Sequence, residues 1–165
     1  MRVEKTNLDG VLLVTLDVFK DHRGEYVETY NKKLYADNGI DVEFVQDDIS
    51  VSSKNVLRGI HGDGRTWKLI SCPYGKIYFV VVVCNPASRQ FGQWQSFILS
   101  EENRQQVLVP PKFGNAHLVL SDKAIFQYKQ TSYYDPGSQF SCKWNDPRFK
   151  ITWPVSEPIL SKRDG

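Results

Sequence analysis

The sequence predicts an all-β fold, either a sandwich or a barrel, in one domain that spans residues 1–165. Short apolar or alternating segments recur along the whole chain, and β-branched and aromatic residues dominate them. Gly, Pro and Asn residues separate these segments. No internal repeat, low-complexity stretch or linker interrupts the pattern, so we expect one β domain with only a few short helical turns.

The first elements are two predicted strands followed by a short predicted helix. Residues 11–19 (VLLVTLDVF) and 25–30 (EYVETY) form the strand-like segments. Residues 31–39 (NKKLYADNG) predict one or two helical turns that end at Gly39. The next predicted strands are residues 42–53 (VEFVQDDISVSS) and 56–61 (VLRGIH).

The second half continues with strands at similar intervals. Residues 67–72 (WKLISC) and 77–84 (IYFVVVVC) flank the turn PYGK, a pattern typical of a β-hairpin. The remaining predicted strands are residues 94–100 (WQSFILS), 105–110 (QQVLVP), 115–121 (NAHLVLS) and 124–134 (AIFQYKQTSYY).

The last part of the chain, residues 137–165, lacks strand periodicity and is rich in polar residues, Pro and Trp. Such a tail usually frays unless it docks on the rest of the protein. Trp144 and Trp153 are large enough to anchor it. Docking would bring the charged end, SKRD, close to a part of the protein that needs charge.

Composition limits the classes of function. The formal charge of +2 is too small to indicate binding to nucleic acid or to a membrane surface, although a local basic site for a small anion remains possible. The cysteines Cys72, Cys84 and Cys142 share no metal-binding spacing, and we expect buried thiols in a reducing compartment. The first residues are charged where a signal peptide is apolar, and residues 77–84, the longest apolar run, are too short to span a bilayer. We therefore expect a cytoplasmic protein.

The sequence has three histidines. His22 lies between two predicted strands and is expected in an exposed turn. His61 ends a strand that faces inward, where a histidine is more often a hydrogen-bonded core residue than a catalyst, and His117 is equally ambiguous. Metal sites in β-barrels usually need His-x-His, because alternate residues of a strand face the same side. Neither His61 nor His117 has a histidine two residues later, so we expect no metal.

Three further candidate residues lie in the predicted strands, two of them near His61. Arg58 precedes it by three residues, and Lys68 follows it by seven in a neighbouring strand. Two cations beside an inward-facing histidine are costly to bury without an anion, although either can lie on a solvated rim. Tyr128 fits an ordinary sheet aromatic as well as a functional one. These residues alone do not define a function.

The order of motifs, however, resembles the dTDP-4-dehydrorhamnose 3,5-epimerase family. The similarity runs collinearly from Val11 to Asp164 through FKDHRGEYVETYN, VEFVQDDISVSSKNVLRGIH, FGQWQSFILSEENRQQVLVPPKFG, LVLSD, YKQTSYYDP, KWNDP and PILSKRD. The resemblance implies a cupin-type jelly-roll barrel, a homodimer and an isomerase that needs neither metal nor cofactor. It also implies a nucleotide-diphosphate sugar as substrate, dTDP- or GDP-linked, and a role in surface polysaccharide synthesis such as capsule or lipopolysaccharide.

Carried over by position, the resemblance assigns catalytic roles. His61 matches the family's base, and Asp164 matches the carboxylate that pairs with it. Tyr128 matches the acid on the opposite face of the sugar. Lys68 and Arg58 match cations near the reacting ketone and the phosphate.

Other matching positions contact the nucleotide in the family. Arg23, Tyr26 and Glu28 belong to a segment that reaches the partner subunit's site, with Tyr26 where the family often has Phe. Gln46 and Asp48 match a QDN-type strand near the nucleotide, with Asp48 in place of Asn.

The sequence departs from the family around the sugar pocket. LRGIHGDGRTWK lacks the aromatic residue after His61, and the loop from His61 to the lysine is about three residues shorter than the family's. PPKFGNAHL places Asn115 where the family has a second histidine. His117 follows two residues later and faces the same side by strand alternation. These changes suggest a sugar other than a 6-deoxyhexose, for example a heptose on GDP.

Several alternatives stay open at this point. The enzyme can invert C3, C5 or both centres, or it can be a 3,4-ketoisomerase of the same substrate class. A non-catalytic cupin that binds sugar nucleotides is a third possibility, and a metal-dependent dioxygenase a remote one.

Overall fold

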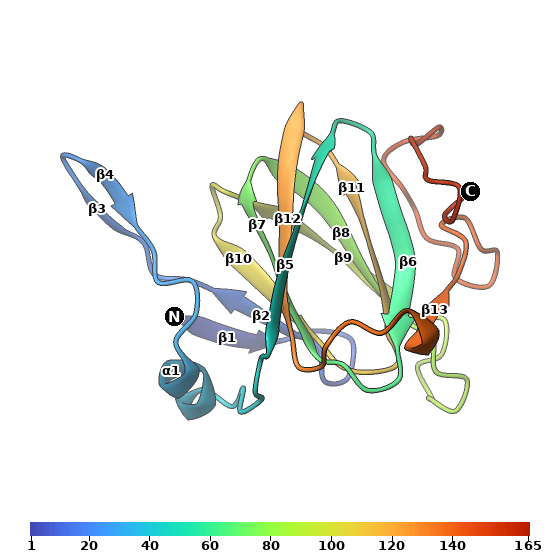
Figure 1. The fold of residues 1–165 in the computed structure, drawn as a ribbon, viewed down its shortest axis with the longest axis horizontal. Helices are drawn as coiled ribbons and strands as arrows, with labels where there is room; N and C mark the ends of the chain where they lie inside the picture. The colour runs from blue at the N-terminus through green and yellow to red at the C-terminus, as the bar shows by residue number, and fades with distance from the viewer.

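The computed structural model describes residues 1–165, and its regular secondary structure is almost all β, with most strands in two facing sheets (Figure 1). The first sheet has the strand order β1-β2-β10-β7-β12-β5 and the second the order β13-β6-β11-β8-β9. The first comprises β1 (Arg2–Lys5), β2 (Leu12–Thr15), β10 (Gln105–Val109), β7 (Lys68–Tyr74), β12 (Lys123–Gln130) and β5 (Gln46–Ser53). The second comprises β13 (Gln139–Ser141), β6 (Leu57–Asp63), β11 (Phe113–Val119), β8 (Lys76–Val83) and β9 (Trp94–Ser100).

The all-β prediction is confirmed, and the jelly-roll architecture follows from the way the chain alternates between the sheets. The two sheets remain separate hydrogen-bonding units and do not close into one ring. Their facing sides enclose the main apolar core, which includes Ile70, Phe79, Val81, Leu99 and Phe126. One end of the space between the sheets stays open, and this end contains the polar residues described below.

The hairpin predicted around PYGK is wrong. β7 pairs with β10 and β12 in the first sheet, whereas β8 pairs with β11 and β9 in the second. Only Gly75, at φ 79°, separates the two strands, and it turns the chain from one sheet to the other. The continuous apolar run of β8 explains the difference. A strand with two buried faces requires a central position between two neighbours, which β11 and β9 supply.

The short helix is confirmed. α1 (Lys32–Asp37) begins at Asn31, whose side chain accepts a hydrogen bond from the Leu34 amide, and Gly39 follows it at φ 88°. The sequence did not predict β1 or β13, each of which is short, or the 3₁₀ turn at Pro136–Ser138.

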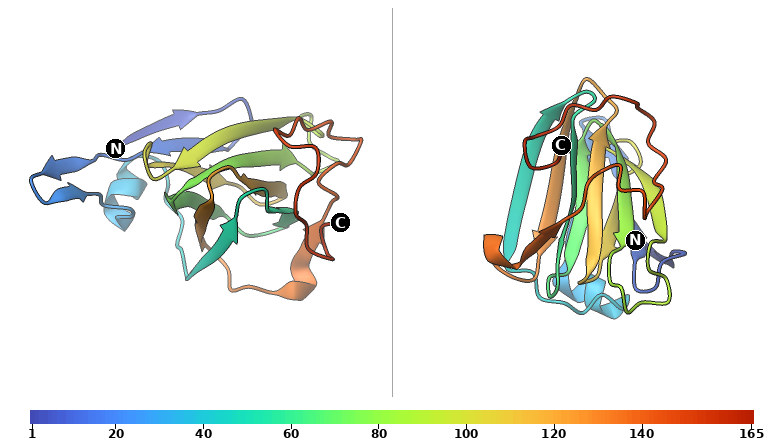
Figure 2. Two further views of the ribbon diagram at one scale, coloured as in Figure 1. Left: turned by 90° about the horizontal axis from the view of Figure 1, so that it is seen from above. Right: turned by 90° about the vertical axis from the view of Figure 1, so that its right-hand side faces the viewer.

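The strand predicted at 25–30 is shorter than expected. Only Gly24–Tyr26 form a strand, β4, which pairs only with β3 (Phe19–Asp21). This hairpin projects away from both sheets (Figures 1 and 2). His22 is exposed in its turn, as predicted. Phe19 and Tyr26 expose 63% and 67% of their surface, so the hairpin has no apolar partner within this chain.

The C-terminal tail docks on the outer face of the second sheet, as predicted. Phe149 is buried there with Ile60, Val82 and Ala116. Trp153 packs edge-on against Tyr78, and its Nε1 donates a hydrogen bond to the Trp144 carbonyl at 2.9 Å. The docked path, visible beside β6 in Figure 1, brings Asp164 near the chain end back to His61.

The cysteines are all free thiols. Cys72 is buried as expected, whereas Cys84 and Cys142 are only half-buried. None of the helices has the length and apolar character required to cross a membrane.

Candidate active site

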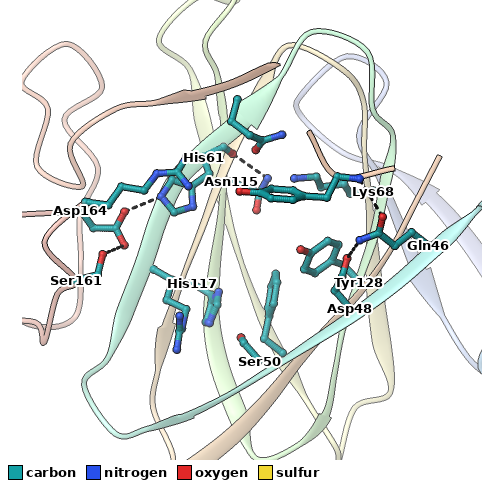
Figure 3. Close-up of a pocket in the computed structure, with 15 residues that line it drawn as sticks. Gln46, Asp48, Ser50, His61, Lys68, Asn115, His117, Tyr128, Ser161 and Asp164 are labelled. Carbon is teal, nitrogen blue, oxygen red and sulfur yellow. Dashed lines mark hydrogen bonds and ion pairs between the residues drawn. The ribbon is translucent and has the colours of Figure 1, made fainter. Parts of the chain in front are cut away.

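A pocket of about 480 Å³ opens between the two sheets (Figure 3). Only three of its fifteen lining residues are hydrophobic, so it suits a polar ligand. The structure brings nine of the predicted site residues into this lining, namely Gln46, Asp48, Arg58, His61, Lys68, Asn115, His117, Tyr128 and Asp164. The other lining residues are Ser50, Phe126, Tyr134, Gln139, Ser161 and Arg163.

Strand register arranges the central residues in two layers. In the outer layer His61 pairs with Asn115 in the second sheet, and Tyr128 pairs with Asp48 in the first. In the inner layer, farther along the same strands, Arg58 pairs with His117 and Phe126 pairs with Ser50. The alternation of inward-facing residues therefore builds the pocket from both walls.

A β-bulge lets Arg58 and His61 share the pocket, although residues three apart normally face opposite sides of a strand. The segment from Arg58 to His61 on β6 spans one residue more than the segment from Asn115 to His117 opposite it. Gly59 lies inside the bulge at φ 116°. A Cβ at this position would lie 2.6 Å from the Ala116 side chain, so only glycine fits.

His61 forms a close pair with the buried carboxylate of the tail. Its Nε2 lies 2.6 Å from Asp164 Oδ1, while the Ser161 hydroxyl donates to Asp164 Oδ2 at 3.0 Å. The carboxylate can only accept, so Nε2 carries the hydrogen and Nδ1 is left as the basic atom.

The surroundings keep His61 neutral. Burial lowers the pKa of His61 more than Asp164 raises it, and the nearby charges of Arg163 and Lys68 lower it further. A neutral imidazole that is fixed by a carboxylate can accept a proton near neutral pH.

Tyr128 lies on the opposite wall from His61 (Figure 3). Burial raises the pKa of Tyr128 to about 12, and the carboxylate of Asp48 adds to this shift. Gln46 donates a hydrogen bond to that carboxylate at 2.8 Å. The phenol therefore retains its proton and can act as a donor.

Three cations face the pocket without an ion-paired carboxylate. Lys68 Nζ lies 5.4 Å from the centre of the Tyr128 ring, and burial lowers the pKa of this lysine. Arg58 donates to the Ser52 hydroxyl at 3.1 Å, and Arg163 donates to the Ser141 hydroxyl. Unpaired cations around a polar pocket favour an anionic ligand.

The structure does not bring Arg23, Tyr26 or Glu28 to this pocket. Arg23 and Tyr26 lie on the projecting hairpin, where Arg23 pairs with Asp21 at 2.6 Å. Glu28 follows the hairpin and is exposed. Within one chain these residues contribute nothing to the site.

Sequence reasoning missed six of the lining residues, although some of them left a signal. Ser50 continues the inward alternation of Gln46 and Asp48, and Phe126 is the corresponding neighbour of Tyr128. Arg163 and Ser161 belong to the predicted SKRD end. Tyr134 and Gln139 lie in irregular segments where periodicity gives no guidance.

No group of three or more His, Cys, Asp and Glu side chains lies close enough together to hold a metal ion.

Fold and pocket together define the class of protein. It is a small jelly-roll protein with acid–base side chains on opposite walls of a polar cavity.

Comparison with known proteins identifies the family within this class. Residues 5–165 match the family model for dTDP-4-dehydrorhamnose 3,5-epimerase. The enzyme of that name from Escherichia coli K12 is 44% identical, with 99% of this chain and 91% of the relative covered. The chain therefore belongs to the dTDP-4-dehydrorhamnose 3,5-epimerase family.

Solved structures agree with this assignment. The dTDP-6-deoxy-D-glucose-3,5-epimerase of Legionella pneumophila, in complex with dTDP-4-keto-L-rhamnose, superposes with a TM-score of 0.94 at 38% identity, covering 99% of this chain and 89% of that one. A 3'-monoepimerase from Streptomyces bikiniensis, in complex with dTDP-quinovose, gives a TM-score of 0.90 at 30% identity, covering 96% of this chain and 83% of that one.

Proposed function

We propose that this protein epimerises a nucleotide-linked 4-keto sugar by removing a proton from C3, C5 or both and returning it from the other face. The observation that carries this proposal is the placement of His61 and Tyr128 on opposite walls of one polar pocket. Family membership supports the same conclusion.

His61 is the proposed base. A ketone at C4 acidifies the hydrogens on C3 and C5, because removal of either gives an enolate. The lowered pKa of His61 keeps its imidazole neutral and ready to accept this proton. Asp164, 2.6 Å away, then stabilises the imidazolium.

Lys68 and Arg58 are the proposed stabilisers of negative charge. Lys68 lies beside Tyr128, with Nζ 5.4 Å from the centre of its ring, and can face the enolate oxygen. One preorganised group of this kind is typically worth roughly 10²–10³ in rate. Arg58, in the inner layer beside His117, adds a second positive charge that favours the enolate.

Tyr128 is the proposed acid. Its pKa of about 12 means that the phenol is protonated at neutral pH, and a carbanion-like carbon is basic enough to take that proton. Because the proton arrives from the wall opposite His61, the centre is inverted.

The substrate is proposed to be a dTDP- or GDP-linked sugar, with Gln46 and Asp48 close to the nucleotide. The names of the relatives support dTDP. The reaction would occur in the cytoplasm and supply sugars for capsule or lipopolysaccharide.

We further propose a homodimer in which the β3–β4 hairpin completes the partner's pocket. Arg23, Tyr26 and Glu28 lie on or beside a hairpin that projects from its own chain, and two of its aromatic side chains are exposed. A two-fold dimer would bury these side chains and bring Arg23 to a nucleotide phosphate.

Incubation of candidate 4-keto sugar nucleotides with the enzyme in D₂O tests the proposal. Deuterium at C3 and C5, with inverted products, is the expected result. Label on one carbon would indicate a single epimerisation. A 3-keto product would establish a ketoisomerase instead, and no label with any candidate would contradict the proposal.

A further inference from the structure

The inner layer of the pocket contains two enclosed polar atoms without any hydrogen-bond partner in the protein. They are Nε2 of His117 and the hydroxyl oxygen of Ser50, and no other buried side-chain nitrogen or oxygen of the chain lacks a partner. Leaving such a group unsatisfied costs about 1–3 kcal/mol. Packing alone does not explain two of them in one cavity, because apolar residues would fill the same positions at lower cost.

The two atoms come from opposite walls of the cavity. His117 lies on β11, exposes only 4% of its surface, and stacks on Phe126 with 4.0 Å between the ring centres. Ser50 lies on β5, opposite Phe126 in register. Figure 3 shows His117 and Ser50 at the same level, below His61 and Tyr128.

The two unpartnered atoms of this layer indicate a neutral ligand group, whereas Arg58, which lies opposite His117 in register, donates its hydrogen bond to the Ser52 hydroxyl at 3.1 Å. Burial, followed by the charges of Arg58 and His61, lowers the pKa of His117 to about 3. The imidazole is therefore neutral and offers one donor and one acceptor, and the serine hydroxyl offers both. A hydroxyl group complements this pair, whereas a methyl group would leave both atoms unsatisfied.

The orientation of the sugar decides which hydroxyl reaches the layer. With the diphosphate on C1 at the open mouth, C4, which lies opposite C1 in the ring, and its neighbour C5 face inward. The inner layer lies two residues farther along each strand than Tyr128 and Asp48, a step of about 7 Å. A methyl group on C5 ends well short of this depth, whereas a longer side chain with a terminal hydroxyl reaches it.

We propose that His117 and Ser50 select a 4-keto sugar whose C5 side chain ends in a hydroxyl group, in preference to one that ends in a methyl group. This inference rests on the proposed epimerase function and adds the class of sugar to it. His117 and Ser50 are specificity-determining residues in this scheme and take no part in proton transfer.

The test uses two substrates with the same nucleotide, a 4-keto-6-deoxyhexose and the 4-keto-6-deoxyheptose that extends its C5 side chain by one hydroxymethyl group. Deuterium incorporation gives kcat/KM for each. We expect the unmodified enzyme to prefer the hydroxylated sugar by at least about ten-fold, as expected when an analogue leaves buried polar groups unpaired.

The variants His117→Phe and Ser50→Ala should each lower kcat/KM for the hydroxylated sugar by about ten-fold and leave the deoxy sugar within about two-fold. Ser53→Ala, the same change at an exposed position of β5, is the matched control and should alter neither value. If His117→Phe does not fold, Ser50→Ala tests the same contact alone.

Two results would overturn the inference. One is an unmodified enzyme without preference between the sugars, and the other is an equal loss on both sugars in the two variants. Absence of exchange with either sugar would contradict the proposed epimerase function, and the inference with it. A failure of the epimerase function is therefore distinguishable from a wrong assignment of specificity, because exchange continues in the latter case.

Discussion

The ability of His61 to accept a proton depends on which of its ring nitrogens carries hydrogen. Asp164 settles this by accepting from Nε2 at 2.6 Å, which leaves Nδ1 basic. Asp164 is itself fixed by Ser161 and exposes only 4% of its surface. A single buried carboxylate thus controls both the tautomer and the charge of the proposed base.

Replacement of Asp164 by Asn tests this arrangement, because it removes the charge and keeps the shape. Since Asp164 raises the pKa of His61 against the effect of burial, its loss should lower that pKa further. We expect exchange to slow by roughly 10²- to 10⁴-fold and the acid limb of kcat/KM to move to lower pH. A pH–rate profile measures both; an unchanged limb would show that Asp164 does not act on His61.

Tyr128→Phe separates proton removal from inversion. His61 remains in place in this variant, so substrate hydrogens should still exchange with solvent, while the inverted product falls by roughly 10²-fold or more because the opposite wall lacks a donor. Chiral analysis of the product alongside deuterium content distinguishes the two events. Inversion at the normal rate would remove Tyr128 from the mechanism.

At the scale of elements, two segments outside the main sheets, the β3–β4 hairpin and the C-terminal tail, carry proposed site residues. The tail returns Asp164 to the pocket of its own chain, held by the burial of Phe149 and the packing of Trp153. The β3–β4 hairpin leads Arg23 away from that pocket. We therefore expect the first contribution to act within the chain and the second between chains.

Mixing two inactive variants tests the contribution between chains. His61→Asn chains keep a normal hairpin, and Arg23→Ala/Glu28→Ala chains keep a normal pocket. If hairpins act on the partner, random mixed dimers restore about one quarter of wild-type activity, because one site in each mixed dimer is intact. Activity no higher than the sum of the separate variants would show that the hairpin does not complete the partner's site.

Sequence patterns predicted these elements to different degrees, for physical reasons. Alternation and β-branched residues located most strands, and helix capping located α1. The pairing of β7 with β8 was wrong because a glycine turn fits a connection between sheets as well as one within a sheet. The bulge at Gly59, which brings Arg58 beside His61, depends on β11 and is not encoded in β6 alone. The position of Asp164 was available only from family resemblance, because an irregular tail has no periodicity.

For the whole molecule, the buried neutral His117 makes stability depend on pH. Folded His117 protonates only near pH 3, whereas an unfolded histidine protonates near pH 6.5, so between these values the unfolded chain binds more protons. Stability should therefore fall as the pH is lowered through this window.

Comparison with His117→Gln isolates this contribution, because the other titrating groups are common to both proteins. The free energy of unfolding of the wild type, relative to the variant, should fall by about 2 kcal/mol between pH 7 and pH 5. Urea unfolding at the two pH values measures the difference. Parallel pH dependences would mean that His117 titrates normally in the folded protein.

The proposed reaction requires that one imidazole in the pocket removes the acidic hydrogens of the sugar. The most direct measurement is deuterium exchange from D₂O by His61→Asn, together with calorimetric binding of the nucleotide diphosphate. We expect exchange to fall by roughly 10²–10⁴-fold, the usual contribution of a general base, while the nucleotide Kd changes less than about three-fold. Exchange at the wild-type rate in a variant that still binds nucleotide would contradict it.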